Sequence, residues 1–259
     1  MSGKRKKDYC AVSLSILNLL KLDGNLPEVQ EFMLDFEKAA WQACRTIFPA
    51  VKPVGCSFHL TQSFYRNIKK IGLAPQYRKD KETRKICRQI LSLHLLPAEK
   101  IVKQFQNIKD GASGLMLKFC CYVEENYIKS TVWTPSNWSM HGQHIRTNNH
   151  VEGTHNKLKA VVGPASTNIV KFLILMKEEA DKIAMTAKLL SQKQVLKKLN
   201  KNAATMQYQL STLWDAHNRA IDPISSKKLL EELGMLTKIH SKAQLLELKE
   251  LQAQDVESD

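Results

Sequence analysis

Asp35 is the first residue along this 259-residue chain whose type and position could do chemistry. It follows a short apolar segment of strand length, Val29–Leu34, and a helical pattern, Phe36–Phe48, begins directly after it. A carboxylate at the end of a strand can hold Mg²⁺, which usually takes one or two protein carboxylates and leaves room for phosphate oxygens. Asp is also a preferred helix N-cap residue, so a cap without chemistry is the alternative interpretation.

Cys56 and His59 form a second candidate, with a Cys-x₂-His spacing. Thiolate and imidazole both bind zinc, but a structural zinc site needs four ligands. The other histidines provide no second pair of this kind, so a buried cysteine beside a hydrogen-bonded histidine is the alternative. The six cysteines are too scattered for a disulfide framework, which indicates a reducing compartment.

The third candidate is the segment Arg146–His155, which reads Arg-Thr-Asn-Asn-His-Val-Glu-Gly-Thr-His. Asn148 or Asn149 can cap a helix, and Glu152 then falls in its first turn, near the positive end of the helix dipole. His155 is three residues further on and shares a face with Glu152. A helical carboxylate facing a strand carboxylate is what a two-metal phosphoryl-transfer site needs. A capping-box-like helix start without chemistry is the alternative.

Positive charge is concentrated in one part of the chain. Lys and Arg number 39 against 25 Asp and Glu, a net charge of +14, and most of the excess lies in the first 163 residues. The stretch 66–88 contains two acidic and nine basic residues, namely Arg66, Lys69, Lys70, Arg78, Lys79, Lys81, Arg84, Lys85 and Arg88. This density favours a polyanionic partner such as DNA, with a solvated helix face as the alternative.

The elements that must position these residues are mostly helices. Residues 9–22 predict a helix buried on a broad face, and strands are predicted at Val29–Leu34 and Val51–Phe58. Pro53 confines the second strand to an edge or an end of its sheet. From His59 to about Val132 the pattern is helical, with breaks at glycines and prolines. The sequence therefore predicts an α/β fold in which helix dominates.

The C-terminal third predicts further helices. Five apolar residues there can share one broad helix face: Leu229, Leu230, Leu233, Leu236 and Ile239. Such a stripe is more often intramolecular core than a binding seam, and a second copy of the chain or a helical protein partner is the alternative. No apolar run approaches the ~20 residues of a membrane helix, so we expect no membrane partner.

Several further short motifs accompany these candidates in a fixed order. They are Leu26-Pro27-Glu28, Leu34–Ala40, Ile47-Phe48-Pro49, Val54–Gln62, Ile71-Gly72-Leu73, Tyr77, Leu93–Pro97, Trp138 and Arg146–His155. In this order and at this spacing, the set resembles the catalytic region of Mutator-like element (MULE) DDE transposases. The resemblance covers roughly residues 1–180.

The resemblance implies a partial RNase H-like core in residues 1–165, with a helical insertion at about 72–140, and a helical C-terminal region at 166–259. The three acidic residues of that family bind divalent metal, so Mg²⁺ or Mn²⁺ is the implied cofactor. The family's second Asp matches Asp35, and its Glu matches Glu152.

The resemblance also implies supporting residues around those two carboxylates. Cys56 and His59 match a Cys-x₂-His that follows the second Asp in the family. Together with Asn149 and His155, they are expected to support the active site, and no zinc ligand is carried over from the family.

The family's first catalytic Asp has no match among the 34 residues before Asp35. We therefore expect a chain that begins inside the domain, without its first three strands, and that does not catalyse strand transfer. On this interpretation Lys4–Lys7 is an internal turn, with a nuclear localisation signal as the alternative.

The expected function is that of a transposase-derived DNA-binding protein whose ancestors cut and joined DNA by two-metal chemistry. Its basic stretch, 66–88, would lie against backbone phosphates. Contacts to phosphates give affinity for DNA without sequence specificity. We expect a nuclear location, with the cytosol as the alternative. Two other functions remain open: a domesticated or decayed fragment that binds DNA or protein without catalysis, and an unrelated helical zinc-binding module built on Cys56 and His59.

Overall fold

The computed structural model describes residues 3–22, 28–147, 153, 160, 169–192 and 201–237. The chain forms two units, one made of residues 1–146 and 207–259 and the other of residues 147–206. The division near residue 165 that the sequence suggests stays a prediction.

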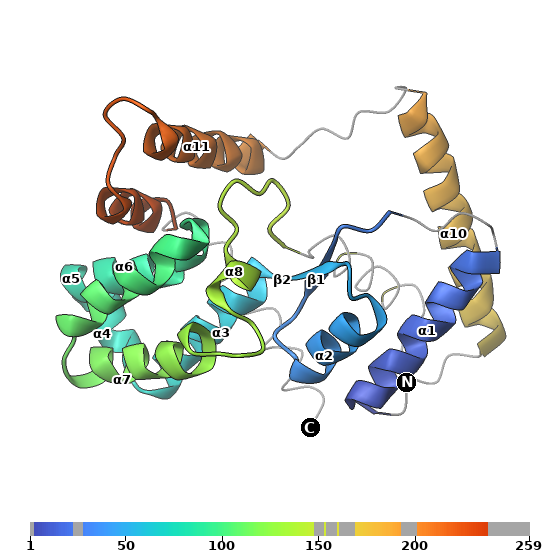
Figure 1. Ribbon diagram of the computed structural model, residues 1–259, viewed down its shortest axis with the longest axis horizontal. Helices are drawn as coiled ribbons and strands as arrows, with labels where there is room; N and C mark the ends of the chain where they lie inside the picture. The colour runs from blue at the N-terminus through green and yellow to red at the C-terminus, as the bar shows by residue number, and fades with distance from the viewer. Residues whose placement is uncertain are drawn as a thin grey trace. The chain divides into compact units, whose positions relative to one another are not determined.

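Two parallel strands form the described sheet of the first unit. β1 (Glu31–Leu34) pairs with β2 (Lys52–Gly55) along its whole length, and α2 (Lys38–Ile47) connects them (Figure 1). Parallel strands need such a crossover because the carboxyl end of the first strand and the amino end of the second lie at opposite edges of the sheet. Both strands were predicted, but the second is shorter than expected because helix α3 already begins at Ser57.

Helix α1 (Lys6–Leu22) lies beside α2 (Figure 1). The expectation that its apolar residues are buried on a broad face was wrong, because none of its described side chains is buried. Ser13 and Leu17 are half-buried, whereas Val12 and Ile16 are 42% and 51% exposed. Packing along one side of a helix shields only a narrow stripe, which leaves the other apolar positions in solvent.

Most of the chain is helical, as predicted. The remaining helices of the first half are α3 (Ser57–Lys70), α4 (Ala74–Lys79), α5 (Lys81–Leu91), the 3₁₀ turn η1 (Leu93–Leu95), α6 (Ala98–Asp110), α7 (Gly114–Val123), the π-helical turn η2 (Glu124–Ile128) and α8 (Pro135–Trp138). They are followed by α10 (Ile169–Ser191), α11 (Lys201–Asn218) and a helix over residues 226–237. Helices stop at the predicted Gly72, Pro97 and Gly111–Gly114; Gly72, for example, has a φ of +79°, which glycine adopts without strain. The boundaries at Asp80 and Ser92 fall at neither glycine nor proline and were not predicted.

A buried aromatic cluster joins α3 to α7. Phe64 is fully buried, with its ring centroid 6.1 Å from that of Phe119 and 5.0 Å from that of Tyr127. Ser63 adds hydrogen bonds to two tyrosine hydroxyls at 2.6 and 2.7 Å, one of them on Tyr127. This cluster fixes the helix that carries His59.

The C-terminal leucine stripe is part of the core, as the sequence favoured. Leu229, Leu230 and Leu233 are at most 3% exposed. Their helix packs on the end of α5, where the Ser92 hydroxyl bonds the carbonyl of Leu233 at 3.3 Å. Ile239 lies outside the described residues.

The helix-dominated α/β class is therefore confirmed, with a small parallel sheet. The finer assignment, an RNase H-like core, stays a proposal. Among the helices that the structure describes, none has the length and apolar character needed to cross a bilayer.

Glu124 provides a pH-dependent contact between α6 and the end of α7. Its carboxylate lies 2.7 Å from the Lys109 ammonium and 3.3 Å from that of Lys129. Hydrogen bonds from these two lysines lower the pKa of Glu124. A lowered folded-state pKa stabilises the fold above the unfolded-state value, and this contribution is lost as the pH falls through the folded-state pKa.

We therefore expect Glu124→Gln to lower the free energy of unfolding at pH 7 by less than about 1 kcal/mol, because the ion pair is near the surface. The difference from the unmodified chain should disappear at an acidic pH below the lowered folded-state pKa of Glu124, where the carboxyl is protonated in both states. Urea unfolding at the two pH values measures it. If the variant loses the same free energy of unfolding at the lower pH, the Glu124 side chain stabilises the fold by packing and not by its charge.

Candidate functional site

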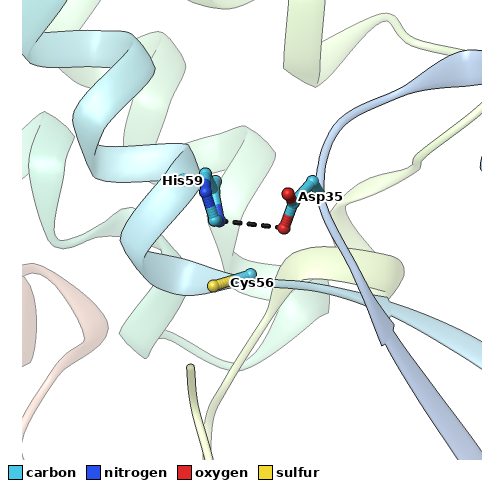
Figure 2. Close-up of side chains that lie close together, drawn as sticks. All are labelled: Asp35, Cys56 and His59. Atoms are coloured by element: carbon cyan, nitrogen blue, oxygen red, sulfur yellow. Dashed lines mark ion pairs between the residues drawn. The ribbon is translucent and has the colours of Figure 1, made fainter. Parts of the chain in front are cut away.

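Asp35, Cys56 and His59 meet at the carboxyl ends of the two strands (Figure 2). The Nδ1 atom of His59 lies 2.9 Å from Oδ1 of Asp35. One oxygen of Asp35, the Sγ of Cys56 and a ring nitrogen of His59 all lie within 4.8 Å of one another. The three side chains therefore place a carboxylate, a thiol and an imidazole around one point.

The local sequence explains this meeting. Asp35 follows β1 and Cys56 follows β2, and parallel strands present their carboxyl ends at the same edge. The ladder extends one step further, since the Cys56 amide donates to the Leu34 carbonyl at 2.9 Å. α3 begins at the next residue, so His59 lies in its first turn, three residues after Cys56.

The backbone after Asp35 is held from two directions. The Asp35 carbonyl accepts hydrogen bonds from the indole Nε1 of Trp41 at 2.7 Å and from the amide of Glu37 at 2.8 Å. The ring of Phe36 covers Gly55, where an added Cβ would lie 2.5 Å from the ring. Glycine before Cys56 thus allows the two segments to approach closely.

Replacing Trp41 tests how far this support matters. Trp41→Phe keeps an aromatic ring but removes the part-buried hydrogen bond from the indole to the Asp35 carbonyl, so we expect the free energy of unfolding to fall by about 1–3 kcal/mol. Urea unfolding measures the loss. Trp133→Phe is the matched control, because its indole bonds Asn126 in an exposed position and should cost less. Equal losses in the two variants would argue against a special role for the Trp41 bond.

The site favours a charged imidazole when no metal is bound. Burial alone would lower the pKa of His59, but hydrogen bonds to Asp35 and Cys56 outweigh burial and raise the pKa to about 10. The Asp35 side chain is 51% exposed and that of His59 is 24% exposed, whereas Cys56 is fully buried. The site is thus open to solvent beside the Asp35 carboxylate and closed beside the Cys56 thiol.

Tyr9 on α1 lies near the same edge. Burial, followed by a hydrogen bond to Glu37, raises the pKa of Tyr9 to about 12. The carboxylate of Glu37 is therefore engaged with a neutral phenol.

The donor set at this point does not fit the expected Mg²⁺ or Mn²⁺. Both prefer oxygen ligands, and here one oxygen donor stands with one sulfur and one nitrogen. The carboxylate that was expected to share the metal, Glu152, lies outside the described residues, as do Asn149 and His155. Pairing of Asp35 with Glu152 therefore stays a prediction.

The segment that leads to Glu152 does start beside the site. Arg146 is the first residue of the predicted motif, and its carbonyl accepts the amide hydrogen of Ser57 at 2.9 Å. Its guanidinium donates to the Gln143 carbonyl at 3.0 Å. The motif's first residue thus contacts the first turn of α3.

The nine basic residues lie on α3, α4 and α5, and we call them the basic surface. They are Arg66, Lys69, Lys70, Arg78, Lys79, Lys81, Arg84, Lys85 and Arg88. Seven are exposed, and Arg84 and Arg88 are half-buried. None of the nine forms an ion pair with another residue in the described ranges.

Contacts around Tyr77 join the three helices of the basic surface. The ring of Tyr77 on α4 lies 6.1 Å from that of Tyr65 on α3, and Lys69 stands 5.3 Å over the Tyr65 ring. From α5, Arg84 donates to the Tyr77 carbonyl at 3.0 Å. One of the two acids in the stretch, Asp80, is engaged as the N-cap of α5 through the Thr83 amide. The three helices that carry the positive charges are therefore joined, and one of the two acids among them is already engaged.

Sequence reasoning did not foresee the ion pair between Asp35 and His59. The available signal was the predicted parallel pairing, which brings the residues after each strand to one edge. Comparisons with known protein families, curated proteins and solved structures find no match to this chain.

Proposed function

We propose that this protein is a transposase-derived DNA-binding protein of the Mutator-like type, which holds the DNA backbone without cutting it. The observation that carries the proposal is the basic surface, nine cationic side chains on three adjoining helices with no described ion-pair partner. Such a surface is suited to a row of phosphates, whose binding releases condensed counterions.

The spacing of these cations supports this role. On α3, Arg66, Lys69 and Lys70 are three and four residues apart and share a face. On α5, the series Lys81, Arg84, Lys85 and Arg88 repeats the same spacing. Contacts of this kind go to phosphates and carry no base information, so we expect affinity with little sequence preference.

The strand arrangement supports the Mutator-like ancestry. The order α1–β1–α2–β2 with parallel strands puts Asp35 at a strand end and the Cys-x₂-His at the neighbouring end. The resemblance drawn from the sequence implies that Cys56 and His59 support the site at Asp35, and this arrangement is consistent with that role. The contact of Arg146 with Ser57 also brings the start of the Glu152 motif to this edge.

The proposal that the protein does not cut DNA rests on the surroundings of Asp35. A two-metal site needs carboxylates free to hold two cations about 3.5–4 Å apart. Here Asp35 is grouped with a thiol and an imidazole, a donor set that suits neither Mg²⁺ nor Mn²⁺. We therefore expect binding in place of strand cleavage.

Fluorescence anisotropy with a labelled DNA duplex of arbitrary sequence tests this function. We expect the logarithm of the affinity to fall linearly with the logarithm of the salt concentration, with a slope between about −4 and −8, corresponding to roughly five to nine phosphate contacts. No binding at low salt, or a slope near zero, would contradict the proposal. Nicking of supercoiled plasmid that needs Mg²⁺ or Mn²⁺ and is abolished by Glu152→Gln would contradict its non-cutting part.

A further inference from the structure

We propose that Asp35, Cys56 and His59 bind one zinc ion and leave its fourth position open. This inference goes beyond the proposed function and does not depend on it. It starts from the meeting of three different donor atoms at one point, which Figure 2 shows between the end of β1 and the first turn of α3.

The distances suit a zinc ion after a small adjustment. Zinc binds sulfur at about 2.3 Å and nitrogen or oxygen at about 2.0–2.2 Å, so neighbouring ligand atoms in a tetrahedral site stand roughly 3.3–3.6 Å apart. The three donor atoms here lie within 4.8 Å of one another, and the Asp35–His59 pair is at 2.9 Å. Side-chain shifts of about 0.4 to 1.5 Å can therefore admit the ion.

The chemistry of the donors selects the metal. A thiolate disfavours Mg²⁺ and Mn²⁺, which prefer oxygen, whereas zinc binds sulfur, nitrogen and carboxylate oxygen together. A doubly charged ion would be balanced by one thiolate and one carboxylate beside a neutral imidazole. This charge balance matters because Cys56 is fully buried, and burying a thiolate without a neighbouring cation is energetically unfavourable.

The protein holds the ligands from three sides. Asp35 is fixed through its carbonyl by Trp41 at 2.7 Å, and Cys56 through its amide by Leu34 at 2.9 Å. His59 belongs to α3, which the buried Phe64 anchors to α7. Because the backbone positions are set before the metal arrives, little ordering has to accompany its binding.

The open side of the site is the side of Asp35, whose side chain is 51% exposed. Zinc sites with three protein ligands keep their fourth position for water or for an incoming ligand. Solvent can thus reach the ion past the carboxylate, whereas the thiol on the buried side cannot be reached directly.

Cobalt substitution of the whole 259-residue chain tests the proposal. After removal of metals with a chelator, we expect Co²⁺ to bind one equivalent and to give a thiolate-to-cobalt charge-transfer band with the intense visible bands of a tetrahedral ion. Zn²⁺ should displace it stoichiometrically, and an excess of Mg²⁺ should not. No charge-transfer band, or equal competition by Mg²⁺, would overturn the proposal without any variant being needed.

Single substitutions then assign the ligands. Cys56→Ser should abolish the charge-transfer band, and Asp35→Asn and His59→Gln should weaken zinc binding by more than the roughly 10–100-fold typical of supporting groups. Cys121→Ser removes a half-buried thiol outside the site and should bind zinc as the unmodified chain does. Circular dichroism checks that each variant folds. Unchanged zinc affinity in a folded Cys56→Ser variant would overturn the assignment, whereas loss of DNA binding alone would bear only on the proposed function.

Discussion

Changing Lys69, Lys70 and Lys85 together to glutamate is expected to weaken binding to duplex DNA by roughly 100- to 1000-fold. The three side chains are exposed and form no ion pair in the described part of the chain. A hydrogen bond to a charged group is worth about 1.5 kcal/mol or more, and each 1.4 kcal/mol changes the affinity tenfold. The salt slope should fall in magnitude by about 3, since three phosphate contacts are lost.

A matched variant separates local contacts from overall charge. Lys103, Lys118 and Lys177 are exposed residues outside the basic surface, and changing all three to glutamate alters the net charge by the same amount. We expect this control to weaken binding much less and to keep most of the salt slope. If both triple variants lose affinity equally, the net charge of the chain and not the basic surface binds DNA.

Phe64→Ala is expected to lower the free energy of unfolding by about 3–5 kcal/mol, the usual range for removing a buried aromatic side chain. Phe64 is 0% exposed and packs against the rings of Phe119 and Tyr127. Loss of the Phe64 ring leaves a cavity between α3 and α7. Because His59 lies on α3, its position is then less firmly fixed. Urea unfolding followed by circular dichroism measures the effect.

Leu117→Ala on α7 provides the comparison for this core variant. Leu117 is 38% exposed, so its truncation should cost less than about 1 kcal/mol. A Phe64→Ala variant as stable as Leu117→Ala would mean that α3 is not held by this cluster. The placement of His59 against Asp35 would then need another explanation.

The sequence predicted both strands and several of the helix ends, because glycine or proline marks those ends. Gly72 and Pro97 stand where α3 and the turn before α6 stop. The burial of α1 could not be predicted in the same way. Its apolar residues are spaced for a helix, but how many of them are covered depends on neighbours far away in the chain, and Ile16 is 51% exposed.

Three residues of the expected site, Asp35, Cys56 and His59, lie together in the structure, whereas Glu152, Asn149 and His155 lie outside the described residues. Asp35 was expected to face Glu152, and the Cys-x₂-His pair was expected to be a supporting feature. In the structure, Asp35 pairs with His59 at 2.9 Å because both follow neighbouring parallel strands. Residue types show which side chains can do chemistry, whereas strand pairing over about twenty residues decides which of them meet.

Lysine footprinting in the presence and absence of DNA tests the central claim most directly. The whole 259-residue chain is acetylated briefly, with and without a saturating DNA duplex at low salt, and each lysine is quantified by mass spectrometry. We expect DNA to protect Lys69, Lys70 and Lys85 strongly and to leave Lys103 and Lys118 as reactive as before. Equal reactivity at the three lysines of the basic surface, under conditions where DNA is bound, would contradict the account.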